Sequence, residues 1–136
     1  MKYALSDLLD RRSILRLKIE RIQDPKRKEV LEKEYQNIDL AVENYVRGGI
    51  CTIKEIEEWD SQIYSVNKQI WNLEEEIGNL ESKLKDEDIQ NTEIFQRIGE
   101  IALKIRKFNN QRIKIKNNIS SKEGGYREIK IYYTSS

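Results

Sequence analysis

Apolar side chains recur every three or four residues along most of the chain, which is the spacing of one face of an α-helix. In the clearest run, at 53–85, three- and four-residue steps alternate over about four heptads, as in a helix that packs against another in a left-handed pair. We therefore predict a long helix over 53–85. Its seam positions are Ile56, Trp59, Ile63, Val66, Ile70, Leu73, Ile77, Leu80 and Leu84.

The same pattern returns at 93–120, after a polar segment at 85–92, and predicts a second long helix. A connection this short requires the two long helices to be antiparallel neighbours. Folding the chain about it sets Leu73 opposite Ile105 and Val66 near Arg112. The seam positions of the second helix are Ile94, Ile98, Ile101, Ile105, Phe108, Arg112, Ile115 and Ile119.

Two shorter helices are predicted ahead of the hairpin, over 6–23 and 25–47. Asp24 and Pro25 separate them, because proline disfavours helical geometry in the residue before it and Asp-Pro is a good cap and first-turn pair. The pair Gly48-Gly49 ends the second helix. Thr52 and Glu55 then form a capping box at the start of the long hairpin. The chain is thus expected to be all-α.

The last residues follow a different pattern. Ser120–Gly125 is polar and rich in glycine and predicts a loop. In Arg127–Tyr133 apolar and polar side chains alternate with the two-residue period of a β-strand. We therefore predict a helical domain over 1–125 and a short C-terminal strand in a tail over 126–136. Because the sequence offers no second strand, we also expect a homodimer or higher oligomer in which this strand pairs across subunits.

Composition limits the possible partners. The 136 residues include 25 basic and 24 acidic side chains, for a net charge of +1. This balance removes the general electrostatic attraction to nucleic acids and anionic membranes, so neither is an expected partner. No apolar stretch is long enough to span a bilayer, and charge near the N-terminus interrupts any secretion signal, so a cytoplasmic location is expected.

One cysteine and no histidine occur in the chain. A disulfide framework and the common zinc sites are therefore not expected, and no metal or other cofactor is predicted. We find no phosphate-binding loop and no nucleophile paired with a base. The consecutive Glu74, Glu75 and Glu76 point in three directions on a helix, so they are a weak signal for acid–base chemistry. No catalytic residue is predicted; an enzyme would have to use Glu74 or Asp10 as its base.

Arg112 is the residue that breaks the apolar seam, and its charge needs a carboxylate, a polar ligand or water. Polar stripes lie beside the seam at the same height on both long helices. One interpretation is a polar pocket for a small anionic or polar ligand, with an indole ring as a stacking wall. The other is that Arg112 pairs with Glu74 or Glu20 and only fixes the register. The candidate ligand-binding residues are Asn67, Trp71, Glu74, Arg106, Asn109, Arg112 and Lys116.

Three segments resemble an uncharacterised family of short helical bacterial and phage proteins, often encoded near glycosyltransferases of surface-polysaccharide synthesis. They are DRRSILRLKIERI at 10–22, NKQIWNLEEEI at 67–77 and IALKIRKFNNQRIKIKNNI at 101–119. The resemblance implies a polar site without naming a substrate, and it adds Lys18 to the candidate ligand-binding residues. The recurrent family positions fall on Asp10, Ser13, Lys18, Glu20, Arg21, Asn67, Trp71, Glu74, Asn109, Arg112 and Lys116.

Two functions follow from these observations. The first is a non-enzymatic helical binding module whose pocket takes a nucleotide or a sugar phosphate; in a phage, such a module could sequester a signalling nucleotide. The second is an oligomeric scaffold or adaptor that acts through its helix faces, with a role in surface-polysaccharide synthesis suggested by the resemblance.

Overall fold

Over residues 3–84 and 90–131 the chain folds into four α-helices. A computed structural model describes the backbone of residues 3–84 and 90–131 and the side chains of 3–84 and 91–124. The helices are α1 (Leu5–Arg21), α2 (Pro25–Arg47), α3 (Ile53–Glu81) and α4 (Gln90–Ile131). The predicted all-α class is confirmed for the described part of the chain.

Local capping sets the corner between α1 and α2. The Asp24 carboxylate accepts a hydrogen bond of 3.0 Å from the backbone N–H of Lys26, and Pro25 occupies the first turn of α2. Since proline has no N–H to leave unsatisfied there, the pair both ends one helix and starts the next. The boundary predicted at Asp24-Pro25 is therefore confirmed.

The connection between α2 and α3 also follows from local sequence. Gly49 has a φ of 76°, a conformation that favours glycine. Thr52 and Glu55 form the predicted capping box, in which the Thr52 side chain accepts from the Glu55 backbone and the Glu55 carboxylate accepts from the Thr52 backbone. The backbone hydrogen bond from Thr52 lowers the pKa of Glu55.

The ends of the long hairpin differ from the prediction. α3 ends at Glu81, and α4 begins at Gln90 instead of residue 93. The predicted last residue of the third helix, 85, lies outside the described residues. Helix termini are set by a few capping contacts, so an apolar pattern locates them only approximately.

The C-terminal prediction is wrong over the described residues. α4 continues through the predicted loop at 120–125 and through 127–131 of the predicted strand, up to Ile131. A single strand would leave its backbone groups without partners, whereas a helix satisfies them within itself. Ile119 and Glu123 are also buried, so packing supports the helix beyond residue 120. Tyr132 and Tyr133 lie outside the described residues.

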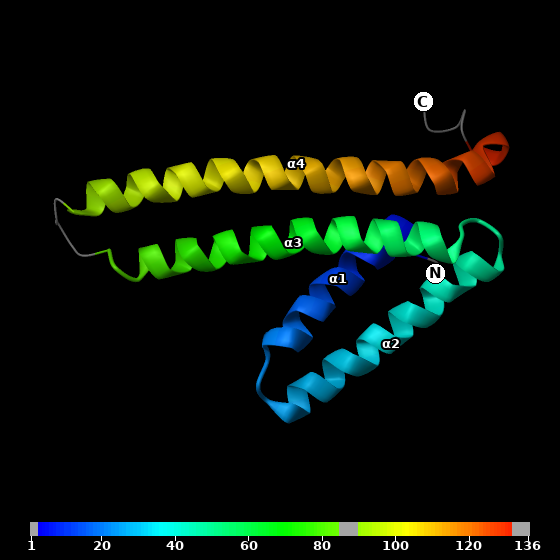
Figure 1. Ribbon diagram of the computed structural model, residues 1–136, viewed down its shortest axis with the longest axis horizontal. Helices are drawn as coiled ribbons and strands as arrows, with labels where there is room; N and C mark the ends of the chain where they lie inside the picture. The colour runs from blue at the N-terminus through cyan, green and yellow to red at the C-terminus, as the bar shows by residue number, and fades with distance from the viewer. Residues whose placement is uncertain (1–2, 85–89, 132–136) are drawn as a thin grey trace.

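The helices alternate in direction, and α3 and α4 run side by side as the long antiparallel hairpin (Figure 1). The ion pair between Glu55 and Lys122, at 3.3 Å, agrees with the predicted register to within one residue. α1 and α2 form a second hairpin that is inclined to the first, with its corner pointing away from α4 (Figure 1). α1 contacts all three other helices, so it is the element that joins the two hairpins.

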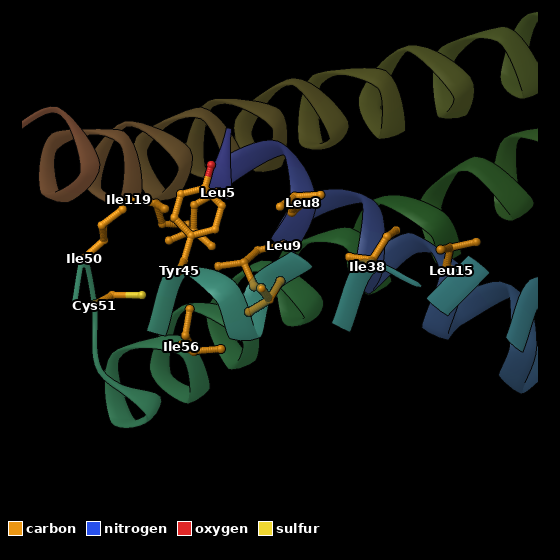
Figure 2. Close-up of a cluster of buried hydrophobic side chains, with 11 residues drawn as sticks. Leu5, Leu8, Leu9, Leu15, Ile38, Tyr45, Ile50, Cys51, Ile56 and Ile119 are labelled. Atoms are coloured by element: carbon orange, nitrogen blue, oxygen red, sulfur yellow. The ribbon is translucent and has the colours of Figure 1, made fainter. Parts of the chain in front are cut away.

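The main hydrophobic core lies where the start of α1, the end of α2, the start of α3 and the later part of α4 meet. Figure 2 shows these side chains converging around Tyr45 and Leu9, with Ile119 contributed by α4. Along the α3–α4 seam, Ile63 and Ile101 are fully buried. The seam becomes half-buried toward the turn between the long helices, at Leu73, Ile77 and Leu80. On α4, however, Ile101 stays fully buried at the height of Ile77, so the seam keeps buried positions beyond α1 and α2.

Candidate functional site

A polar cluster of five residues, Asp10, Ser13, Asn67, Arg112 and Lys116, lies where α1 crosses the long hairpin. Asp10 is at its centre. Its Oδ1 accepts a hydrogen bond of 2.9 Å from Asn67 Nδ2, and its Oδ2 lies 3.7 Å from Arg112 Nε and 3.4 Å from Lys116 Nζ. One carboxylate of α1 thus contacts side chains of both α3 and α4.

Ser13 completes the hydrogen bonding at the centre of the polar cluster. Its Oγ accepts from Asn67 Nδ2 at 2.6 Å, and its hydroxyl donates to the Asp10 carbonyl at 2.7 Å. Ser13, Asn67 and Asp10 are all buried. Buried polar groups of this kind are costly unless paired, so each helix is held in the one position that satisfies them.

The charges of the polar cluster are matched within the chain. Lys116 is shared between Asp10 and Asp7, which lies 3.0 Å from its Nζ. Arg112 is half-buried, and its Nε has no hydrogen-bond partner in the described structure. The predicted Arg112 partners, Glu74 and Glu20, are wrong, because Arg112 faces Asp10 of α1 instead. The arrangement supports the interpretation in which Arg112 fixes helix positions.

A second feature, the basic cleft, lies between the α1–α2 corner and Trp71 of α3. It is a cavity of about 620 Å³ with apolar walls from Ile22, Val30 and Leu31. Its charged lining is entirely basic. Those side chains are Lys18 and Arg21 from the end of α1, and Lys26 and Arg27 from the first turn of α2.

The cations of the basic cleft differ in whether they pair with other side chains of the protein. Arg21 donates to Asn72 Oδ1 at 2.8 Å and to Glu75 Oε1 at 3.1 Å, and its guanidinium lies 5.5 Å from the Trp71 ring. The Trp71 indole N–H also donates to Glu75, at 2.7 Å. Among the residues that the structure describes, Lys18, Lys26 and Arg27 have no carboxylate within 4.0 Å. Three cations therefore face the cleft without an acidic partner, beside an indole whose orientation is fixed.

The residues of the predicted pocket lie in two separate places in the structure. Asn67, Arg112 and Lys116 belong to the polar cluster, whereas Lys18 and Trp71 belong to the basic cleft. Glu74 and Arg106 are exposed and Asn109 is half-buried, and the cleft is not lined by any of these three. Lys26 and Arg27 of the cleft were not among the predicted ligand-binding residues. The available signal was the run Lys26, Arg27 and Lys28 directly after the proline that starts α2.

A partly buried ion network also connects α1 to both neighbouring helices. Arg12 donates to Asp39 of α2 at 2.8 Å and to Asp60 of α3 at 3.0 Å. Burial lowers the pKa of Arg12, but the attraction of the Asp60 and Asp39 carboxylates outweighs burial and raises it overall. Arg16 also lies 3.9 Å from Asp60, so two guanidinium groups face the two carboxylates, and the network holds α1 against α2 and α3.

Cys51 is a buried free thiol in the α2–α3 connection. Burial raises its pKa, which keeps the thiol protonated and poorly nucleophilic at neutral pH. In the part of the chain that the structure describes, His, Cys, Asp and Glu side chains do not gather into a group that could hold a metal ion. The basic cleft is therefore the strongest candidate for ligand binding.

No family model, curated protein or solved structure matches this chain. The family resemblance of the three sequence segments thus stays a prediction. Within residues 3–84 and 90–131, none of the helices has the length and apolar character needed to cross a bilayer.

Proposed function

We propose that this protein is a helical binding module that holds a small anionic ligand with a planar ring, such as a nucleotide, in the basic cleft. The observation that carries the proposal is the presence of three cations without acidic partners, Lys18, Lys26 and Arg27, around an ordered indole. Such cations attract phosphate, and an indole face stacks on a planar ring.

The size and walls of the cleft fit the same class of ligand. A volume of about 620 Å³ is typical of small-molecule sites, which combine apolar walls with a few directed polar groups. The first turn of α2 borders the cleft, and the positive end of the helix dipole adds to the positive potential there. The lining contains no carboxylate, hydroxyl or thiol, so its charged groups are all cations of the kind that bind an anion.

Calorimetric titration with three probes tests this proposal: a nucleoside diphosphate, a sugar phosphate and inorganic pyrophosphate. We expect binding of the nucleotide to exceed that of pyrophosphate by roughly tenfold, because only the nucleotide can stack on Trp71. In a Trp59→Phe background, where Trp71 is the remaining tryptophan, the same titration should change the fluorescence. The absence of heat with every probe would contradict the proposal.

Variants locate the site. Lys18→Ala and Arg27→Ala should each weaken nucleotide binding by roughly tenfold, as expected when a phosphate loses one charged hydrogen bond. Lys33→Ala is the matched control, because Lys33 is an exposed lysine of α2 outside the lining of the cleft. Equal losses in Lys33→Ala would indicate nonspecific attraction to positive charge and not a site.

A further inference from the structure

One face of the long hairpin is covered by α1 along only part of its length. α1 contacts both long helices at Asp10, through Asn67 and Lys116, and then passes over α3, where Arg21 reaches Asn72 and Glu75. Beyond that crossing the same face continues without a neighbouring helix (Figure 1).

The residues of the uncovered part follow from alternating three- and four-residue steps, which keep to one face of a paired helix. From Asn67 these steps lead along α3, and from Lys116 they lead back along α4. Every residue of this stretch, which we name the distal face, is exposed. The distal face consists of Glu74, Gly78 and Glu81 on α3 and Phe95, Gly99 and Ala102 on α4.

Two glycines lie at the centre of the distal face. The hairpin register places Gly78 within one residue of the position opposite Gly99. A Cβ atom built on either glycine would meet no other group within 4 Å, so contacts within the protomer do not require glycine there. Glycine lowers helix stability relative to alanine, and close approach of another helix is a usual reason for it in a helix interior.

An aromatic side chain projects from the same face. Phe95 is 59% exposed and lies one helical turn before Gly99. An exposed ring and the open space above two glycines on one surface suit a self-complementary two-fold interface, because each protomer then offers both a group that inserts and a space that receives it.

The charges of the two long helices are also complementary. α3 carries eight carboxylates against two lysines, whereas α4 carries ten basic side chains against four carboxylates. On the distal face, Glu74 and Glu81 have no basic partner and the neighbouring Arg106 has no acidic partner among the described residues. When the α3 edge of one protomer lies along the α4 edge of another, opposite charges face each other on both sides of the axis.

We infer that the distal face binds the distal face of a second copy of this chain, forming a two-fold homodimer. The partner's hairpin covers Gly78 and Gly99, buries Phe95, and continues the helix layer that α1 supplies over the other part of the hairpin. This dimer uses α3 and α4 and does not involve the predicted C-terminal strand.

Sedimentation velocity of the full chain at micromolar concentrations tests the inference. We expect a dimer for the native sequence and a monomer for Phe95→Asp, which places a charge in the interface. Leu40→Asp is the matched control, because Leu40 of α2 is also 59% exposed but lies outside the distal face, and this variant should remain dimeric. A native monomer would overturn the inference, as would a Phe95→Asp dimer.

A Gly99→Leu variant separates association from folding. The added side chain meets nothing within the protomer and improves helix propensity, so the melting temperature of the dilute protein should not fall. Because the same side chain occupies the open space above Gly99, the dimer dissociation constant should rise by roughly tenfold or more. An unchanged dissociation constant would overturn the inference. Nucleotide binding in the basic cleft is measured separately, so either proposal can fail without the other.

Discussion

Asp10 has a single charge, yet it contributes to the packing of three helices. Its carboxylate faces an amide of α3 and two cations of α4 from a position that is almost fully buried. Removal of Asp10 leaves Asn67 short of an acceptor and both cations short of a counter-charge. Removal of Arg112 still leaves Asp10 paired with Lys116 and Asn67. The energetic centre of the polar cluster is therefore Asp10 and not Arg112.

We expect Asp10→Ala to lower the free energy of unfolding by about 3 kcal/mol, the range for a broken buried ion pair. Arg112→Ala should cost about 1 kcal/mol, because Arg112 is half-exposed and its partner keeps other contacts. Urea unfolding of both variants measures the difference. Lys114→Ala, an exposed change on α4, is the control and should leave the stability unchanged. A larger loss in Arg112→Ala than in Asp10→Ala would contradict the assignment.

At the scale of the helices, the α3–α4 hairpin is stabilised by an apolar seam with fully buried positions both beside α1 and nearer the hairpin turn. Ile63 is fully buried where α1, α3 and α4 approach one another, and Ile101 is fully buried nearer the turn, opposite the half-buried Ile77. The polar contacts of α1 then fix which part of α3 it covers.

Two isoleucines of α3, one buried and one exposed, test how much the seam contributes to stability. Ile63→Ala should lower the free energy of unfolding by about 3 kcal/mol, since it removes buried methyl groups and leaves a cavity. Ile53→Ala, at a position 65% exposed, should change it by less than about 0.5 kcal/mol. Chemical denaturation of the two variants checks the contrast. Equal effects would mean that the seam at Ile63 does not form part of the core.

At the scale of the whole molecule, the two hairpins do not form a compact bundle. The inclined α1–α2 hairpin leaves one end of the α3–α4 hairpin projecting (Figure 1). The same inclination opens the basic cleft at the α1–α2 corner and leaves the distal face uncovered. Both proposed binding surfaces thus result from the angle between the hairpins.

Small-angle scattering tests this shape. α4 has 42 residues, so it is roughly 63 Å long at 1.5 Å per residue. A compact domain of 136 residues has a radius of gyration of roughly 14 Å. For the Phe95→Asp variant, expected to be monomeric, we predict a radius clearly above that value and a maximum dimension of at least 60 Å, roughly the length of α4. A value near 14 Å would contradict the projecting hairpin.

The sequence by itself determined the helical class, the antiparallel hairpin and the boundaries around Pro25, Gly48 and Thr52. These features depend on local chemistry: proline geometry, a glycine turn, a capping box and the period of the apolar positions. The same reasoning failed for 127–131, because a two-residue alternation describes a strand only where a partner strand exists, and α4 instead continues by completing its own hydrogen bonds.

Only the tertiary structure decided which polar side chains meet. The sequence pattern located Arg112, Lys116 and Asn67 at one height of the hairpin. Their common partner, Asp10, lies on α1, and the angle at which α1 crosses the hairpin cannot be read from the spacing of apolar residues. That angle also places Lys18 and Trp71 in a separate cleft, together with Lys26 and Arg27. The physical reason is that spacing along a helix fixes which residues share a face, whereas packing between helices fixes which faces touch.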